Sequence, residues 1–216
     1  MILKLENVFY KYKNNAPYIL NGMSYEFEKG KLYAVMGSSG SGKTTLISII
    51  ANLDKPASGK IYYDGTDISA MNDDDYRAKK VSIIFQNYNL LYNYTAVDNI
   101  TTILNISGYK GNYAYRADEL LDEVGISKEK RKYVVQNLSG GEQQRIAIAR
   151  AVASDSEVIL ADEPTGNLDK PNGENIMNIF KTLISKYNKC IIIVTHSDFI
   201  AGHADCVLNI KNGKIT

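Results

Sequence analysis

Residues 37–44 of this chain read Gly37-Ser38-Ser39-Gly40-Ser41-Gly42-Lys43-Thr44, followed by Thr45. The pattern is G-x-x-x-x-G-K-[ST], a loop whose backbone N–H groups surround phosphate groups. Glycine and other small residues let the backbone approach an anion, and a helix that begins there adds the positive end of its dipole. Lys43 supplies a full positive charge for the terminal phosphates, and the Thr44 hydroxyl is placed to bind Mg²⁺. The stretch therefore predicts a nucleoside triphosphate site.

The flanks of this loop agree with that prediction. An apolar run of strand length, Leu32 to Met36, precedes it. After it, Leu46, Ile49, Ile50 and Leu53 recur at helical spacing. A chance match in a Gly/Ser-rich turn would lack this strand–loop–helix context. The loop alone indicates triphosphate binding, but it does not indicate how the energy is used.

Composition sets limits on size and partners. The chain has 216 residues, of which 44% are hydrophobic, enough for one sizeable core with a subdomain. Its 25 basic and 24 acidic residues give a formal net charge of +1, so nothing favours nucleic acid as a partner. No apolar run approaches the roughly 20 residues of a membrane span, and the N-terminus lacks a signal-peptide apolar region. We expect any link to a membrane to run through a partner.

The pattern of strands and helices predicts an α/β fold. Apolar runs at 81–85, 158–161 and 191–194 are rich in β-branched residues, which is typical of parallel strands buried on both faces. Helical patterns lie between or beside them, and short strands open the chain. The helices are expected at 114–124, 142–152 and 174–187, and hairpins at 61–68 and 207–215.

Polar residues follow each buried run. Gln86 ends the first, Asp162-Glu163 the second and Thr195-His196 the third. Ligands of open α/β sheets bind outside the carboxyl ends of the strands, so we expect these residues to meet at the phosphate loop. Asp162 could hold Mg²⁺ through water, Glu163 could orient or deprotonate the attacking water, and His196 could contact the γ-phosphate. Gln86 could touch Mg²⁺ or the water. The alternatives are a solvated acidic turn and a structural histidine.

A second stretch with anion-binding character is 138–145, Leu-Ser-Gly-Gly-Glu-Gln-Gln-Arg. Ser139 and Glu142 have the spacing of a capping box that opens a helix. Gly140 and Gly141 cost helix stability, about 1 kcal/mol each relative to alanine, which is reasonable if the backbone there approaches another group closely. The helix start would then be a second anion site, with an ordinary capped helix as the alternative.

Together these motifs resemble the ABC-type ATPases, in the order typical of that family and over essentially the whole chain. Residues 37–44 match its Walker A motif, Gln86 its Q-loop, 138–142 its signature, 158–163 its Walker B motif and His196 its H-loop. Asn167-Leu168-Asp169 matches the D-loop. The resemblance implies that Tyr12 stacks on adenine, with neighbouring Tyr10 as the fallback.

The resemblance also implies a fold and a partner copy. It implies a single ABC ATPase domain over 1–216, with a mostly parallel RecA-like core sheet, a small antiparallel β subdomain and an α-helical subdomain. The core and β subdomain would cover about 1–86 and 151–216, and the helical subdomain about 87–150. Two copies would sandwich two MgATP head-to-tail, with Ser139, Gly140, Gly141, Glu142 and Asp169 contacting the ATP of the other copy.

A membrane permease is the other implied partner. In the family the segment after the Q-loop glutamine receives a coupling helix from the permease, and here apolar and aromatic residues cluster between Tyr88 and Tyr94, before Thr95, an expected helix cap. Local packing of the helical subdomain is the alternative. The resemblance places the chain in the cytoplasm, at the inner face of the cell membrane through its permease.

The residues 162–169, Asp-Glu-Pro-Thr-Gly-Asn-Leu-Asp, resemble the lipoprotein-release, macrolide-export and antimicrobial-peptide-resistance branch and also the cell-division ABC ATPase. Export or extraction of a peptide, lipid-linked or drug-like substrate is therefore expected. The alternative is an ATPase that moves no substrate and signals to a cell-envelope or cell-division partner. Action on DNA or ribosomes is disfavoured, because long coiled coils and a second cassette are not present. Two departures from the family are Ser197 after His196 and the missing proline at 133–137.

Overall fold

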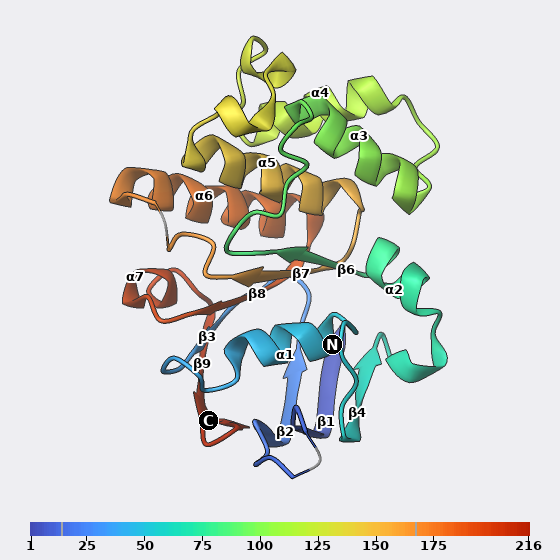
Figure 1. Cartoon of the computed structure of the whole chain (residues 1–216), viewed down its shortest axis with the longest axis vertical. Coiled ribbons are helices and arrows are strands. Elements are labelled where there is room, and N and C mark those ends of the chain that lie inside the picture. Colours follow the sequence, from blue (N-terminus) through green and yellow to red (C-terminus); the bar gives the residue numbers. More distant parts are fainter. Residues whose placement is uncertain (14, 167) are drawn as a thin grey trace.

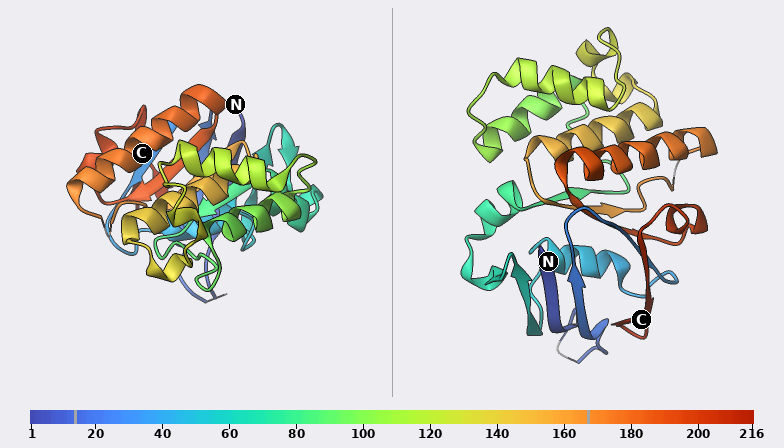
Figure 2. Two further views of the ribbon diagram at one scale, coloured as in Figure 1. Left: turned by 90° about the horizontal axis from the view of Figure 1, so that it is seen from above. Right: turned by 180° about the vertical axis from the view of Figure 1, so that it is seen from behind.

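The computed structural model describes residues 1–13, 15–166 and 168–216. Two sheets and the helices around them form stacked layers (Figure 1). Helix α1 lies between the two sheets, and α5 and α6 cover the opposite face of the larger sheet, with α3 and α4 beyond them (Figures 1 and 2). No helix in the described ranges combines the length and the apolar character that a bilayer crossing requires.

The larger sheet has six strands in the order β10-β9-β3-β8-β7-β6. All neighbouring pairs from β9 to β6 are parallel, and only the short β10 runs antiparallel to β9. The three apolar runs predicted as parallel strands are confirmed as adjacent parallel strands of this sheet, with the run at 81–85 at its edge. The strands are β3 (Leu32–Met36), β6 (Val81–Ile84), β7 (Val158–Asp162), β8 (Cys190–Thr195), β9 (Cys206–Lys211) and β10 (Lys214–Ile215).

The smaller sheet is antiparallel, with the order β2-β1-β4-β5. Its strands are β1 (Leu3–Tyr10), β2 (Leu20–Phe27), β4 (Ser58–Tyr63) and β5 (Thr66–Asp67). Both predicted hairpins form, at β4–β5 and at β9–β10. Each turn is a pair with positive φ, Asp64-Gly65 at 46° and 78° and Asn212-Gly213 at 51° and 73°, as two-residue hairpin turns require.

The helices match the sequence pattern except at their ends. Helix α1 stops at Ile50, so Leu53 lies outside it and is 52% exposed, which contradicts its place in the predicted helical stripe. Thr95 caps α3 through a capping box, as expected. Helices α2 and α7 were not predicted. The set is α1 (Lys43–Ile50), α2 (Asp73–Lys79), α3 (Ala96–Ser107), α4 (Tyr113–Glu123), α5 (Gly140–Ala153), α6 (Lys170–Tyr187) and α7 (Asp198–Ala201), with 3₁₀ turns at Ile68–Ala70, Lys130–Lys132 and Val135–Asn137.

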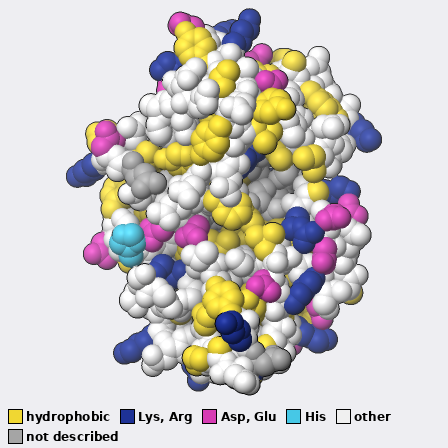
Figure 3. All heavy atoms as spheres, in the orientation of Figure 1, with side chains coloured by type: hydrophobic (Ala, Val, Ile, Leu, Met, Phe, Trp, Pro, Cys, Tyr) yellow, Lys and Arg dark blue, Asp and Glu magenta, His cyan; other side chains and the backbone are white. Residues whose placement is uncertain are grey.

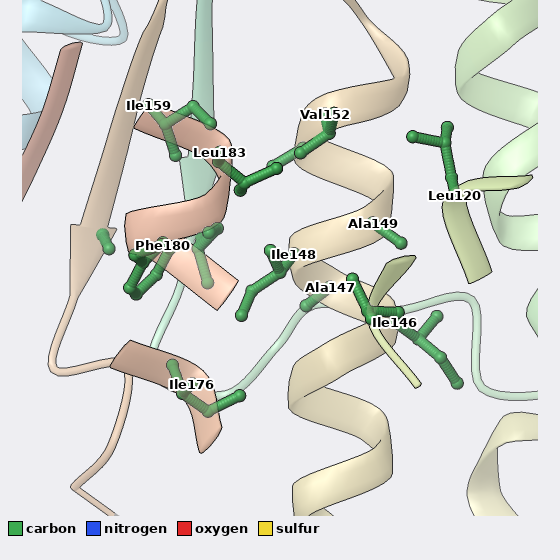
Figure 4. Packing of buried hydrophobic residues seen from close by; sticks show 14 of the residues in the cluster. Leu120, Ile146, Ala147, Ile148, Ala149, Val152, Ile159, Ile176, Phe180 and Leu183 are labelled. Atoms are coloured by element: carbon green, nitrogen blue, oxygen red, sulfur yellow. The ribbon is translucent and has the colours of Figure 1, made fainter. Parts of the chain in front are cut away.

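The core has two parts, one on each face of the larger sheet. Alternate residues of a strand point to opposite faces. In β8, for example, Ile191 and Ile193 pack with α5 and α6, whereas Ile192 and Val194 pack with α1 and the smaller sheet. Figure 4 shows the first part from close by, with Ile148 of α5 beside Phe180 and Ile176 of α6. Helix α5 is thus seated on the sheet and also contacts α3 and α4.

Candidate functional site

The carboxyl ends of β3, β8, β7 and β6 lie side by side, because these strands are parallel neighbours. A pocket of about 600 Å³ opens at this edge. It brings together residues that are far apart in the sequence, as the strand-end argument predicts. The residues that line it are Tyr12, Ile19, Ser39, Gly40, Gly42, Lys43, Thr44, Thr45, Gln86, Asp162, Glu163 and His196. The sequence predicted each of these except Ile19, which carries no recognisable signal.

The phosphate loop joins β3 to α1 as expected. Gly42, at the N-terminus of α1, has φ of 102°, and a Cβ there would lie 3.0 Å from a methyl carbon of Ile19. Glycine is therefore required by both conformation and space. The Lys43 ammonium folds back along the loop and donates to the carbonyl oxygens of Gly37, at 2.7 Å, and Ser38, at 3.0 Å. The first N–H groups of α1 face the pocket edge without intrahelical acceptors, which makes an anion site.

Thr44 and Asp162 form the oxygen-rich part of the pocket. The Thr44 hydroxyl donates to Oδ2 of Asp162 at 2.9 Å. Burial raises the pKa of Asp162, and the nearby Glu163 carboxylate raises it further, while the Thr44 hydrogen bond and the Lys43 charge act in the opposite direction. A half-buried carboxylate beside a hydroxyl offers the hard oxygen ligands that Mg²⁺ prefers. The donor set therefore fits a magnesium ion.

Glu163 is held in one orientation by the end of β8. Its Oε2 accepts a hydrogen bond from the Thr195 hydroxyl at 2.8 Å, and its Oε1 accepts one from the backbone N–H of His196 at 3.0 Å. Its backbone has φ of 46°, which is uncommon for a residue with a side chain and occurs most often at functional sites. The sequence placed Thr195 beside His196 but did not indicate that it orients Glu163.

Tyr12 and Tyr10 were alternatives for an aromatic contact with the base. Tyr12 is 67% exposed and lines the pocket, and its hydroxyl lies 3.0 Å from that of Thr45. Tyr10 is 5% exposed, and its hydroxyl donates to Asp54. Its ring edge packs against Tyr12 rather than facing the pocket. Between the two rings, Tyr12 is the accessible one.

The signature stretch 138–142 lies apart from this pocket, since none of its residues lines it. Ser139 caps α5 and forms the predicted capping box with Glu142. The Glu142 carboxylate, 8% exposed as a residue, accepts from the N–H and hydroxyl of Ser139 and from Lys130 Nζ at 2.5 Å. Glu142 therefore serves the helix start and is already paired. No sequence signal indicates that Lys130 pairs with Glu142.

Close packing explains why one of the two glycines in the first turn of α5, Gly141, has no side chain. A Cβ at Gly141 would lie 3.0 Å from Oδ1 of Asn172, so the close approach predicted for this backbone is made to the chain's own α6. Asp169 caps α6 by accepting from the N–H and Nδ2 of Asn172, at 3.0 and 2.7 Å. The starts of α5 and α6 are thus joined through Asn172. Asn167, the first residue of the predicted D-loop, lies outside the described residues.

The segment from Tyr88 to Tyr94 is only partly exposed. Leu90 is 5% exposed and belongs to the core, and Tyr88 is half-buried against it, so the prediction of an exposed apolar loop is wrong for Leu90. Leu91, Tyr92 and Tyr94 are 40, 40 and 56% exposed. Local packing therefore describes Tyr88 and Leu90, whereas an open surface describes Leu91, Tyr92 and Tyr94.

A second cavity, of about 270 Å³, lies between α2, β6, α3 and the end of α5. The exposed side chains of Leu53 and Ile106 are at its rim, and Phe85 lines it. Hydrophobic side chains gather across the middle of the face in Figure 3, where basic and acidic groups are interspersed. The sequence did not predict this groove. Its lining is Leu53, Arg77, Ala78, Val81, Ser82, Ile83, Phe85, Ile103, Ile106, Arg150, Ala151 and Ser154.

Comparison with known proteins gives consistent matches over the whole chain. The family model described as "ABC transporter" matches residues 20–166. An uncharacterized ABC transporter ATP-binding protein of Bacillus subtilis, YclH, is 41% identical over 216 residues, covering 100% of this chain and 96% of the relative. A lipoprotein-releasing system ATP-binding protein of Rhodopseudomonas palustris, LolD 1, is 35% identical over 99% of this chain and 98% of the length of that protein.

A solved structure is similar in fold and length. It is a dimeric post-hydrolysis state of the ATP-binding cassette MJ0796, a protein of Methanocaldococcus jannaschii, bound to ADP and Pi. It matches with a TM-score of 0.88 and 35% identity, covering 99% of this chain and 96% of that one. The phosphate loop, the strand-end carboxylates and the separate signature helix are thus found in a chain whose fold is that of a dimeric nucleotide-binding cassette.

Proposed function

Because this chain belongs to the ABC transporter family, as an ATPase of that family, we propose that two copies close around two MgATP molecules and drive a separate membrane permease. The observation that carries the proposal is the pocket at the carboxyl ends of four parallel strands. It holds a phosphate loop, a Thr44–Asp162 oxygen pair and an oriented Glu163 within one cavity. A triphosphate, a hard cation and an attacking water each find suitable groups there.

In this proposal the chain's own residues divide the work of phosphoryl transfer. Lys43 and the backbone of 37–45 hold the β- and γ-phosphates, and Tyr12 stacks on the base. Mg²⁺, when bound, neutralises phosphate charge, and Thr44, Asp162 and Gln86 are the residues that would hold it. Glu163 orients and polarises the attacking water, and His196, 75% exposed in its side chain, reaches the γ-phosphate.

The signature helix supplies the argument for a second copy. Ser139 and Gly140 are exposed at the start of α5, where N–H groups and a hydroxyl form an anion site that no part of the chain's own pocket reaches. A head-to-tail partner would bring Ser139, Gly140, Gly141 and Asp169 over the other copy's ATP. The dimeric, ADP- and Pi-bound state described for MJ0796 supports the formation of a nucleotide-bound dimer.

We place the permease contact at the groove rimmed by Leu53 and Ile106, together with the exposed Leu91, Tyr92 and Tyr94. An apolar groove with exposed apolar side chains at its rim is the kind of surface that a partner covers. This contact would hold the chain at the inner face of the membrane. We propose export or extraction of a lipid-linked, peptide or drug-like substrate, and the names of LolD 1 and of the macrolide export protein MacB support the lipid-linked and drug-like classes.

We also propose the domain division that the family implies: a core with its β subdomain at about 1–86 and 151–216, and a helical subdomain at about 87–150. The packing of α3 and α4 on one side of α5 supports a helical unit. The limit near 150 falls inside α5, which ends at Ala153 and also packs on β6. Helix α5 is therefore the element shared by both parts.

Mixed dimers test the composite site. Lys43→Ala removes the phosphate lysine, and Ser139→Glu places a negative charge at the start of α5, so each variant alone should lack turnover. In a mixed dimer one site combines the intact Lys43 of one copy with the intact Ser139 of the other. Mixing should therefore restore up to roughly a quarter of the wild-type phosphate release, since half of the dimers are mixed and each has one intact site.

The control for this test is a mixture of Lys43→Ala with Lys43→Ala carrying a second tag. No mixed pair then has an intact site, so its rate should stay at background. Full activity of Ser139→Glu alone, or no recovery in the first mixture although tag exchange shows that mixed dimers form, would contradict the head-to-tail site.

A further inference from the structure

Two adjacent residues after Gln86 have an unusual backbone. Tyr88 and Asn89 have φ of 60° and 47°, both in the left-handed region, and neither is glycine. For a bulky residue such as tyrosine this conformation is a genuine outlier, and it persists only where surrounding groups hold it. Gln86, which lines the nucleotide pocket, is two residues before this turn.

Arg150 holds that turn. From the last turn of α5, its Nη2 donates to the carbonyl oxygen of Tyr88 at 2.8 Å and its Nη1 to that of Asn89 at 2.5 Å. In the part of the chain that the structure describes, no carboxylate pairs with Arg150. Burial lowers the pKa of the guanidinium, so the fold bears a cost for placing it there. Both hydrogen bonds that offset this cost go to the strained turn.

Asn99 fixes the other end of the same segment. Asn99 is fully buried, and its Oδ1 accepts a hydrogen bond from the N–H of Leu91 at 2.9 Å. Its Nδ2 donates to the carbonyl oxygens of Leu91, at 3.1 Å, and Thr95, at 3.0 Å. Between these ends, Leu90 packs in the core and the Tyr92 hydroxyl donates to the carbonyl oxygen of Asn87 at 2.9 Å, while the carbonyl oxygens of Tyr88 and Asn89 are held by Arg150.

Arg150 also lines the groove assigned above to the permease, beside Phe85 and Ile103. Phe85 directly precedes Gln86 at the end of β6. The segment runs from the end of β6 across α5 to α3 (Figure 1). One side chain thus touches both the groove and the turn that follows Gln86.

We propose that Arg150 is a positioning residue for ATP hydrolysis, whose guanidinium fork holds the Tyr88–Asn89 turn and thereby sets Gln86 in the nucleotide pocket. The expected effect on ATP hydrolysis rests on the role of Gln86 under the proposed function, whereas the expected effect on the Tyr88–Asn89 turn is independent of that role. Lysine keeps the charge and its N–H donors but lacks the rigid planar fork that spans the two carbonyls, so Arg150→Lys should be intermediate between wild type and Arg150→Ala.

The first measurement is amide hydrogen exchange of the full chain without nucleotide. In Arg150→Ala, peptides that cover 87–92 should exchange about tenfold faster, while peptides in β3 and β8 keep the wild-type rate. Arg150→Lys should show a smaller increase in the same peptides, and circular dichroism verifies that both variants are folded. Unchanged exchange at 87–92 in both variants overturns the proposal.

The second measurement is steady-state ATP hydrolysis. Arg150→Ala should lower kcat by about tenfold with the KM for ATP nearly unchanged, because a misplaced Gln86 affects the reacting end of ATP and not its binding. In a Gln86→Ala background the Arg150→Ala change should have little further effect. Arg116→Ala, which removes an arginine of α4 that pairs with Glu119, is the matched control and should retain the wild-type rate.

The outcomes separate the two ideas. Additive losses from Arg150→Ala and Gln86→Ala, or a rise in KM alone, overturn the positioning role. If Gln86→Ala itself leaves kcat unchanged, the proposed role of Gln86 is wrong. The exchange at 87–92 then decides whether Arg150 holds the turn.

Discussion

Oε1 of Glu163 accepts a hydrogen bond from the backbone N–H of His196 and lies 2.6 Å from Nδ1 of the same residue. The carboxylate is nearly enclosed, with 11% of its side chain exposed, whereas the His196 side chain is 75% exposed. The two groups that follow neighbouring strands β7 and β8 are therefore paired. Glu163 is held at the wall of the pocket, and the histidine ring extends into it.

Replacing Glu163 by glutamine keeps the shape of the side chain but removes its negative charge. Glu163→Gln should lower kcat by about 10²- to 10⁴-fold, the usual contribution of a positioned base, while ATP binding and ATP-dependent dimer formation remain. Phosphate release and size-exclusion chromatography with ATP measure the two properties. Glu174→Gln, a neutralised glutamate on the exposed surface of α6, is the control and should behave as wild type. Wild-type turnover by Glu163→Gln would remove Glu163 from the mechanism.

The two histidines of the chain differ in their surroundings. His203 Nδ1 lies 2.8 Å from the carbonyl oxygen of Phe199, and its ring packs on Phe199, away from the pocket. His196→Ala should therefore lower kcat by about 10²-fold, as loss of one transition-state donor does, without a large loss of stability. His203→Ala should keep kcat. Thermal unfolding of both variants separates a catalytic loss from a folding defect, and equal kcat values for the two would contradict the assignment.

Tyr12 should bind the base through its ring. Tyr12→Ala should raise the KM for ATP by about tenfold, which corresponds to roughly 1.4 kcal/mol of aromatic contact, with kcat less affected. Tyr12→Phe keeps the ring and loses only the hydrogen bond with Thr45, so it should remain close to wild type. Tyr115→Ala removes a ring of similar exposure on α4 and serves as the control. If Tyr12→Phe raised the KM for ATP as much as Tyr12→Ala does, the loss would come from the hydroxyl group, and stacking of the ring on the base would be excluded.

The ionised carboxylate of Asp162 should lower the free energy of unfolding at neutral pH when no cation is bound. Its pKa is raised in the fold, chiefly by burial, so the ionised form is disfavoured there. A raised pKa contributes stability below the unfolded value, about 3.9, and that contribution is lost as pH rises through the folded value. Asp162→Asn should therefore have a higher Tm than wild type at pH 7 without magnesium, and this difference should vanish near pH 3.5.

Magnesium with ATP provides the counterpart to this stability measurement. The ligands should raise the Tm of wild type and raise that of Asp162→Asn much less, because the amide cannot supply the carboxylate charge. Thermal unfolding with and without MgATP measures both shifts. An equal ligand-induced shift in the two proteins would show that Asp162 does not hold the cation.

Much of the central sheet and the nucleotide pocket could be predicted from sequence, because both rest on local signals. Buried parallel strands are continuous apolar runs, and the phosphate loop is a contiguous motif. The carboxyl ends of such strands meet at one edge whatever the loop lengths, so Gln86, Asp162 and His196 could be placed together. The helix cap at Thr95 and the capping box at Ser139 are equally local and were confirmed.

Features that depend on pairs of distant residues could not be predicted. Nothing in the sequence indicates that Lys130 pairs with Glu142 or that Arg150 reaches Tyr88 and Asn89, since each contact joins separate elements. The choice between Tyr10 and Tyr12 depended on burial, because both carry the same ring. Helical spacing at Leu53 was misleading because the helix had already ended at Ile50.

The two parts of the core share the strands β3, β7 and β8, whose successive residues point alternately into one part and the other. Neither part can lose its packing while the other remains intact, because each needs the same strands in place. Heating should therefore give one thermal transition for the whole chain, with calorimetric and van't Hoff enthalpies that agree. A cavity made at Phe180, on one face, and one made at Phe27, on the other, should both lower that single midpoint.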